Sequence, residues 1–153
     1  MTINLQQDLP RLLPRAIAWA EPREKEILQT GSPLDSKGIA IARAVGVIKP
    51  EQIRISRVLR LPLPDDPELR EAALITGLLG PKMVGLTLGY GIYLCQGHDS
   101  PSLLSHECRH VYQYEQAGSI ASYLPVYLQQ IVTVGYLNAP FEMDARNHER
   151  RSA

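Results

Sequence analysis

The sequence predicts an α+β fold, in which helical segments flank a short series of strands. Three observations predict it: helical patterns at both ends, an alternating apolar run over 52–61, and a β-rich segment over 83–95. Helices, then a few strands, then helices is an order typical of α+β domains. With 153 residues, 44% of them hydrophobic and 21% charged, the chain has the size and composition of one globular domain, 1–153.

Six helical segments are expected, because residues that begin and stop helices lie at their ends. Ser100-Pro101 is typical of an N-cap followed by a first-turn proline, and Gly118 is typical of a C-terminal stop. The expected helices are, in chain order, 12–30, 35–45, 67–76, 101–117, 125–134 and 140–149. The first helix and the residues before it would form an N-terminal helical extension over 1–30.

Two segments are expected to form strands. In 52–61, Ile53 and Ile55 alternate with polar residues, which indicates a half-buried strand. The segment 83–95 is interpreted as a hairpin, with strands over 84–88 and 92–95 joined by a turn at Gly89-Tyr90-Gly91. Ser32-Pro33 is interpreted as a break between helices.

Charge, hydropathy and cysteine content argue against several classes. The 16 basic and 16 acidic residues give a formal net charge of zero, so a nucleic-acid-binding surface is not expected. The longest apolar stretch, 120–137, contains Pro125 and Gln129, so stable membrane insertion is not expected. The N-terminus does not resemble a secretory signal, and Cys95 and Cys108 form no CxxC pair. We therefore expect a cytoplasmic protein with two buried, reduced thiols.

One motif, His106-Glu107-Cys108-Arg109-His110, lies in the expected helix 101–117. Residues four apart on a helix project from the same face, so both imidazoles can bind one ion. Two neutral imidazoles and a carboxylate suit Zn²⁺ and leave a position for water, which predicts one zinc ion per chain. Glu107 lies beside this pair and is expected to be the catalytic general base, which takes a proton from water.

The motif is rare by chance, and its helix has a suitable pattern. The composition predicts roughly 0.007 chance occurrences in a chain of this length. On a helical wheel, Leu104, Cys108 and Val111 form an apolar stripe, and both histidines lie nearly opposite it. The helix can thus bury one face and present the other to a cleft. The alternative is an ordinary helix with two solvated histidines.

A catalytic zinc site needs a third protein ligand, and the candidates lie in the segment 140–149. They are Glu142, Asp144, His148 and Glu149. We favour Glu142, because the small side chain of Ala145 one turn later would let this helix approach the first one. The alternative is that Glu142 is a solvated carboxylate at a helix start, where acidic residues are favoured.

Asp144 is expected to have a different role from Glu142. Positions two apart diverge by about 200° on a helix, so the two carboxylates cannot both face one ion. Asp144 would either accept a hydrogen bond from the ring nitrogen of a ligand histidine that does not bind the ion, or pair with His148 one turn later.

Several other polar side chains have two interpretations. Tyr136 and Arg146, and also Tyr90 and Tyr93, are candidates to stabilise an oxyanion, although tyrosines commonly pack in cores with a polar tip. His98 is either an additional ligand or a solvated loop residue.

The histidine motif with a downstream glutamate resembles the gluzincin branch of the zincin metallopeptidases. The resemblance is closer to the small bacterial zincin domains often encoded near contractile injection systems, and it covers about 31–146. The matching segments are Gly31-Ser32-Pro33-Leu34, Ile53-Arg54-Ile55, Thr87-Leu88-Gly89-Tyr90-Gly91-Ile92 and 103–113. The chain departs from these domains at Cys108 and Arg109, where Leu and Thr or Ala are usual, and in a long helical insert between His110 and Glu142.

The resemblance implies a small zincin-like domain, with an active-site helix packed on a short hairpin or sheet and several further helices. It implies a zinc metallopeptidase that hydrolyses a peptide or protein substrate. It also implies that the strand Ile92, Tyr93, Leu94 and Cys95 is an edge that pairs with extended substrate. The alternative for this strand is a hairpin that is paired on both sides.

Two further functions stay open for a chain with this motif. A non-catalytic zincin-fold module would bind or regulate a partner and retain the zinc site. A regulator or toxin component would cleave only one partner. Fold alone does not decide between these functions.

Overall fold

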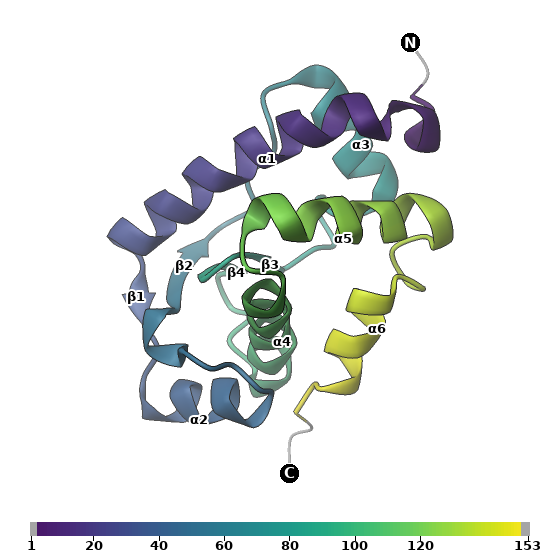
Figure 1. Cartoon of the computed structure of the whole chain (residues 1–153). Helices are drawn as coiled ribbons and strands as arrows, with labels where there is room; N and C mark the ends of the chain where they lie inside the picture. The colour runs from purple at the N-terminus through teal and green to yellow at the C-terminus, as the bar shows by residue number, and fades with distance from the viewer. Residues whose placement is uncertain (1–2, 151–153) are drawn as a thin grey trace.

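The computed structural model describes residues 3–150, and these residues form six α-helices and a four-stranded mixed sheet (Figure 1). The expected α+β class is confirmed. The elements are α1 (Leu5–Thr30), β1 (Ser32–Pro33), α2 (Ser36–Ala44), the 3₁₀ turn η1 (Pro50–Gln52), β2 (Arg54–Val58), α3 (Pro67–Thr76), β3 (Gly85–Leu88), β4 (Gly91–Cys95), α4 (Pro101–Ala117), α5 (Ile120–Val134) and α6 (Pro140–Asn147).

The sheet has the strand order β1-β2-β4-β3. β2 pairs with β4 in parallel, with Ile55 opposite Ile92, and the two outer pairs are antiparallel. A parallel pair needs a crossover connection, and the segment with α3 and β3 supplies it. The consequence is that β4 lies inside the sheet and β3 lies at its edge.

β4 is buried on both faces, which explains its uninterrupted apolar sequence. Ile92 and Leu94 pack into a core with Cys108 of α4, whereas Tyr93 and Cys95 pack into a second core with residues of α1 and α5. Successive side chains of a strand point to opposite faces, so one strand contributes to two cores. A strand with two buried faces is apolar throughout instead of alternating.

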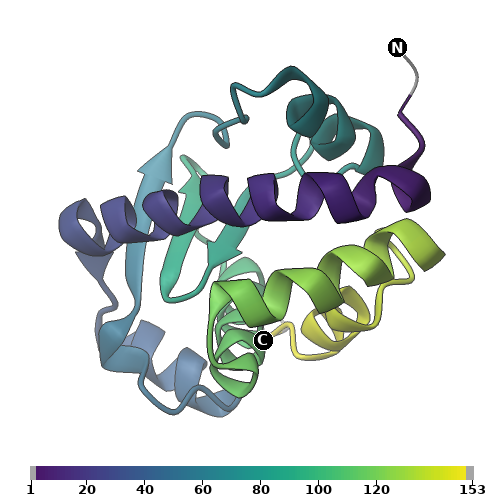
Figure 2. The ribbon, with the colours of Figure 1, turned by 45° about the horizontal axis from the view of Figure 1, so that its top comes forward.

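The helices form layers on the two faces of the sheet. α1 crosses one face and contacts β2, β3 and β4, and α4 and α2 pack together against the other face. α5 lies alongside α1, and α6 packs against α4 (Figures 1 and 2). This arrangement brings α5 and α6 together with α4, which packs against the outer strand β3.

Most helix bounds agree with the expected ones, but α1 is longer. It begins at Leu5 because the side chain of Asn4 caps it, accepting a hydrogen bond from Gln7 N at 3.0 Å. The three prolines inside α1 are all exposed, so their rings lie on the solvent face. α1 is more than an appended extension, since Ala20 and Ile27 belong to the core.

Two smaller differences concern Ser32-Pro33 and the start of α5. Ser32-Pro33 was expected to be only a break, but it forms the short strand β1, which pairs with β2. α5 begins five residues before the expected start, because Ser119 caps it and Pro125 is accommodated inside it. Among the helices at residues 3–150, none combines the length and apolar character needed to cross a membrane.

Candidate metal centre

The helix α4 presents the two motif histidines on one face. Ser100 caps its first turn, with the side-chain oxygen accepting from Leu103 N at 3.1 Å. Cys108 and Val111 are fully buried on the opposite face, which fixes the rotation of the helix. The rings of His106 and His110 lie edge to face with their centroids 5.0 Å apart. The expected division of this helix into a core face and a histidine face is confirmed.

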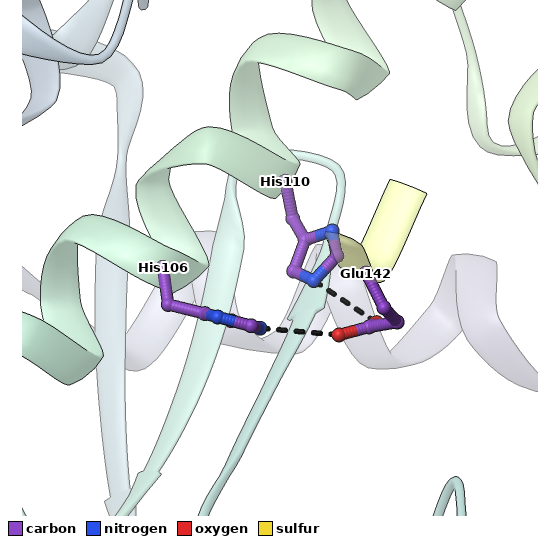
Figure 3. Close-up of side chains that lie close together, drawn as sticks. All are labelled: His106, His110 and Glu142. Atoms are coloured by element: carbon purple, nitrogen blue, oxygen red, sulfur yellow. Dashed lines mark hydrogen bonds and ion pairs between the residues drawn. The ribbon is translucent and has the colours of Figure 1, made fainter. Parts of the chain in front are cut away.

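The helix α6 brings Glu142 against both histidines (Figure 3). Glu142 Oε1 lies 3.2 Å from His106 Nε2, and Oε2 lies 3.1 Å from His110 Nε2. Candidate ligand atoms of the three residues all lie within 4.8 Å of one another, so this buried group can hold a metal ion. Ala145 is fully buried one turn after Glu142 and leaves room for the close approach of α6 to α4.

The other nitrogen of each ring has a hydrogen-bond partner that fixes the ring. His106 Nδ1 lies 2.8 Å from Glu149 Oε2, and His110 Nδ1 lies 2.8 Å from Gln113 Oε1. The Gln113 amide nitrogen donates to Phe141 O at 2.9 Å and to a carboxylate oxygen of Asp144 at 3.0 Å. The Gln113 oxygen must therefore face His110, and both Nδ1 atoms act as donors.

It follows that each Nε2 of a neutral ring carries a lone pair toward the centre. These lone pairs face carboxylate oxygens, which are also acceptors, so a proton or a cation is needed between them. Two imidazole nitrogens and a carboxylate are a suitable donor set for a borderline-soft ion such as Zn²⁺. Histidines that donate through the other ring nitrogen to a fixed acceptor are characteristic of protein metal sites.

The centre also perturbs the pKa values of its members. Burial lowers the pKa of His106, but the hydrogen bond to Glu142 and the nearby carboxylates outweigh this and raise the pKa to about 9. The pKa of His110 is raised, since Glu142 and Glu107 outweigh the effect of burial there as well. Burial raises the pKa of Glu142, but its hydrogen bonds to the two histidines hold it well below the usual range. The pocket thus favours positive charge at the two Nε2 atoms.

Glu107 lies next to this group without belonging to it. Its side chain is buried, and Thr87 Oγ1 donates a hydrogen bond of 2.8 Å to Oε1. The strand β3 approaches closely enough that a Cβ atom on Gly85 would lie 2.8 Å from Glu107 Oε2. Burial raises the pKa of the Glu107 carboxyl. Glu107 is therefore a buried carboxyl with a raised pKa that lies beside the ligand group.

Sequence reasoning missed three tyrosines whose hydroxyl groups converge behind the centre. Tyr127 donates to Glu142 Oε2 at 2.7 Å, Tyr123 donates to Gln113 Oε1 at 2.9 Å, and Tyr114 donates to Thr87 O at 3.3 Å. The rings of Tyr123 and Tyr127 stack with centroids 5.5 Å apart. In the sequence, Tyr123 and Tyr127 are four residues apart, a spacing that predicts a shared helix face. The spacing does not predict what that face contacts.

The other candidate ligands lie outside the group. Asp144 accepts hydrogen bonds from Arg109 Nε at 2.8 Å and from the Gln113 amide. It is therefore connected to His110 only through Gln113. Glu149 contacts His106 through Nδ1, on the side away from the centre. His148 Nδ1 lies 2.8 Å from Asp144 O, and His98 is an exposed loop residue.

Of the four side chains considered as oxyanion donors, only Tyr136 lines the cleft. Tyr136 lines the same cleft as Glu142, and burial keeps the pKa of its hydroxyl well above the usual value, so the hydroxyl remains a donor. Arg146 donates to Leu137 O in the connection between α5 and α6 and is not part of the cleft wall. Tyr90 OH donates to Glu115 at 2.7 Å, and Tyr93 is buried in the core.

The expectation that Ile92, Tyr93, Leu94 and Cys95 form the edge strand is wrong. β4 is paired with β2 on one side and with β3 on the other, and all of its residues are buried. The edge strand beside Glu107 is β3. The uninterrupted apolar sequence of β4 was the pattern that indicated a central strand.

A cleft with a volume of about 140 Å³ opens from the centre along β3. Glu107, His110 and Glu142 form part of its wall, together with the whole of β3. The remaining wall consists mainly of apolar side chains from α1, α3 and α5. The candidate metal centre is therefore continuous with an apolar recess.

Comparisons with protein-family models, curated proteins and solved structures find no match to this chain. The geometry by itself defines a class: an α+β protein with a buried group of two histidines and a glutamate that can hold a metal ion.

Proposed function

We propose that the chain is a zinc-dependent metallopeptidase of the zincin type. The observation that supports it is the convergence of His106 Nε2, His110 Nε2 and the Glu142 carboxylate, with the Glu107 carboxylate buried beside them. Two histidines and a glutamate are a known ligand set for catalytic zinc. The packing of α4 against β3 and the sequence resemblance to small zincin domains support the same assignment.

In this proposal, the roles of the residues follow from their positions. Zinc would supply Lewis acidity, which polarises a substrate carbonyl and lowers the pKa of water. Glu107 takes the proton from water and transfers it to the leaving amine, and burial raises its pKa toward the range in which both steps are feasible. Thr87 holds one Glu107 oxygen and leaves the other free to act. Tyr136 is the candidate donor to the developing oxyanion.

The substrate would be an extended peptide that lies along β3. Val84 O accepts from Cys95 N, so by antiparallel alternation the backbone groups of Gly85 and Thr87 point away from β4. Thr87 O already accepts a hydrogen bond from Tyr114 OH, so the groups left for a substrate are Thr87 N and those of Gly85. Such an edge can add a peptide as a further strand. Gly85 and Thr87 are also the residues next to Glu107, which places a peptide on this edge beside the proposed base. A cytoplasmic location is proposed as well, because both cysteines are free and buried.

Zinc content and hydrolysis, measured on one sample, test the proposal. The purified protein should contain about one zinc per chain after dialysis, and it should cleave casein. Glu107→Gln should retain the zinc and lose hydrolysis by about 10²-fold or more, because the shape persists and the proton acceptor is gone. Glu71→Gln, at an exposed position on α3, is the matched control and should leave both properties unchanged.

Two results would contradict it. A protein that neither contains nor takes up zinc would remove the basis of the assignment. Loss of zinc from Glu107→Gln would show that Glu107 is a ligand and that its role as base is wrong.

A second candidate function is a non-catalytic binding or regulatory module with a structural metal ion. The depth of the centre favours it, since Glu142 is only 2% exposed and the ligands join two helices as a structural ion would. Retention of one zinc with no cleavage of casein or of unfolded proteins would select this function.

A further inference from the structure

The walls of the apolar recess differ in how firmly they are attached to the molecule. The recess measures about 140 Å³, and a protein cavity of about 150 Å³ holds a molecule of the size of benzene. A larger molecule can therefore enter only if a wall moves. β3 belongs to the sheet, and α1 and α5 pack along each other, so these walls are held in place. The remaining wall is α3.

The helix α3 makes few apolar contacts with the rest of the molecule. Among the described residues of α3, Leu69 is the only buried one, and α1 is the only described element on which α3 packs closely. The outer side of α3, with Arg70, Leu74 and Ile75, is exposed to solvent. Figure 1 shows α3 at the outside of the molecule, next to the N-terminal half of α1. Segments that bury few apolar side chains open locally at a lower free energy than the core does.

The connections on both sides of α3 suit a rotation of the whole helix. Leu61 before α3 and Leu79 after it are buried in the core that also contains Leu88. Gly77 ends α3 with a φ of 79°, and a Cβ atom there would meet nothing within 4 Å. Hinges are commonly a few residues at the ends of an element. α3 can therefore rotate between two anchored ends while the core stays intact.

Three ion pairs hold the start of α3 against α1. Arg11 Nη1 lies 2.8 Å from Glu68 Oε1. Arg15 Nη1 lies 2.9 Å from Asp66 Oδ2 and 3.2 Å from Glu68 Oε1. The four side chains are between 24% and 44% exposed, so each pair is weak and sensitive to salt. These three ion pairs, named the latch below, can hold the helix and still release it.

We propose that α3 is a lid on the apolar recess and that the latch holds it closed. Opening rotates α3 away from α1 about its two anchored ends and widens the path to the metal centre. The lid goes beyond the proposed peptidase function and does not depend on it, since any large ligand of the recess requires the same opening.

Hydrogen exchange of the full-length protein, followed by mass spectrometry, tests the lid. Amides of α3 should exchange about 10-fold faster or more than those of α4, because α3 opens locally and α4 opens only with the core. Sodium chloride at about 0.5 M screens the latch, so it should accelerate exchange in α3 and leave α4 unchanged. Equal protection of α3 and α4 would overturn the proposal, because α3 would then open only when the whole protein unfolds.

A matched pair of variants tests the latch. Arg15→Gln removes two of the three ion pairs. Exchange in α3 should then be about 2- to 25-fold faster, since each exposed ion pair contributes a factor of about 1.4 to 5. Arg70→Gln, the same substitution at an exposed position of α3 outside the latch, should have no effect. Glu68→Gln with Glu71→Gln as its control repeats the comparison from the other side of the latch. Equal exchange within both pairs would reject the latch.

A thiol in the recess tests whether α3 covers it. Leu12 of α1 lines the recess and is buried, so a cysteine at this position reacts with N-ethylmaleimide only after an opening. In Leu12→Cys, labelling should be about 2- to 25-fold faster when Arg15→Gln is added, in parallel with exchange, and unchanged when Arg70→Gln is added. The protein without Leu12→Cys gives the background from its two buried cysteines.

Faster exchange in α3 with unchanged labelling would overturn the proposal, because α3 would then open without uncovering the recess. If Leu12→Cys does not fold, hydrogen exchange in the other variants still decides whether α3 opens and whether the latch controls it. Neither readout needs a metal ion or hydrolysis. A protein without zinc would therefore reject the peptidase function and leave the lid testable, and equal protection of α3 and α4 would reject the lid and leave the peptidase function.

Discussion

Gln113 and Glu149 decide which nitrogen of each histidine faces the centre. Each supplies an oxygen at 2.8 Å from an Nδ1 atom, and this leaves Nε2 of the same ring directed at Glu142. Gln113 is itself held by Asp144 and by the backbone of Phe141. Gln113 is not itself a candidate ligand, but it thus determines whether His110 can act as one.

The first prediction tests this control of the tautomer. Gln113→Leu removes the acceptor of the His110 Nδ1 proton at nearly constant size, so zinc affinity should fall by about 10- to 100-fold. Competition with a chromophoric chelator measures the affinity. Gln116→Leu, the same change at an exposed position of the same helix, is the control and should have no effect. Equal affinity of both variants would show that the Gln113 contact does not matter.

The second prediction separates the two carboxylates of α6. Glu142→Ala removes a charge in direct contact with both Nε2 atoms, so zinc affinity should fall by orders of magnitude. Asp144→Ala removes contacts with Gln113, Arg109 and His148 but none with a ring of the ligand group, and a loss of about 10-fold to 100-fold is the upper limit expected for such a residue. The same chelator competition compares the two variants. The reverse order of the two losses would reverse the assignment of the third ligand.

At the scale of elements, the close contact of β3 with α4 positions Glu107. Gly85 has no side chain at the point where the Glu107 carboxylate approaches the strand, and Thr87 holds that carboxylate from the next position on the same face. β3 therefore positions the proposed base, and this close approach depends on the absence of a side chain at Gly85.

The third prediction concerns this glycine. In Gly85→Ala, the new Cβ atom would lie 2.8 Å from Glu107 Oε2, so the carboxylate must move away from Thr87. The free energy of unfolding should fall by about 1–3 kcal/mol, as for other overpacked cores, and hydrolysis should fall while zinc is retained. Urea unfolding, zinc content and casein cleavage measure the three effects.

Gly38→Ala is the control for that variant. A Cβ atom there would meet the Leu34 side chain at 3.1 Å, on α2 and away from the recess wall. It should leave hydrolysis unchanged. Loss of zinc from Gly85→Ala would contradict the idea that β3 positions only the base.

At the scale of the whole molecule, the candidate ligands join the middle of the chain to its C-terminal part. His106 and His110 lie on α4 and Glu142 lies on α6, with the whole of α5 between them in the sequence. A metal ion bound only in the folded state would hold these elements together and stabilise the protein by mass action.

The fourth prediction is a large effect of metal removal on thermal stability. With free zinc at about 1,000 times the Kd, the stabilisation is about 4 kcal/mol, which corresponds to roughly 10 °C in Tm for a chain of this size. Calorimetry with and without EDTA measures the shift. His110→Ala should abolish it, because the variant lacks one ligand. An unchanged Tm after complete removal of zinc would contradict the prediction.

The fifth prediction is that a rise in pH from 6.5 to 9 widens the stability difference between the zinc-loaded and metal-free proteins. In the metal-free protein, the pKa of His106 is raised to about 9, from about 6.5 in an unfolded chain. Its contribution to stability is complete below about pH 6.5 and is lost as the pH rises through 9. Zinc competes with protons for the same Nε2 atoms, so zinc binding strengthens over this range.

The Tm difference between the two forms should therefore widen from pH 6.5 to 9, which calorimetry across this range would measure. Below this range, the lowered pKa of Glu142 gives a contribution that is present above about pH 4.5 and is lost in acid. A metal-free Tm that rises between pH 6.5 and 9 would contradict the prediction.

The sequence by itself determined the features that depend on local periodicity. The spacing of His106 and His110 and the apolar stripe through Cys108 and Val111 are properties of one helix, so the pattern predicts which face each residue occupies. The bounds of α3 and α4 follow from Pro67 and from the Ser100 and Gly118 caps, which act within one turn. The helical angle between Glu142 and Asp144 showed that only one of them can face an ion, and the small side chain of Ala145 one turn later favoured Glu142.

The tertiary structure alone decided what depends on packing between distant segments. β4 is central because β2 pairs with it in parallel across an intervening helix and strand, and no local pattern specifies that partner. The roles of Gln113, Glu149 and Tyr127 depend on which helices meet, since a hydrogen-bonding side chain gives no indication in the sequence of the partner it will find. The recess arises in the same way: its walls come from helices at both ends of the chain, and they form one surface only when α1 and α5 pack side by side.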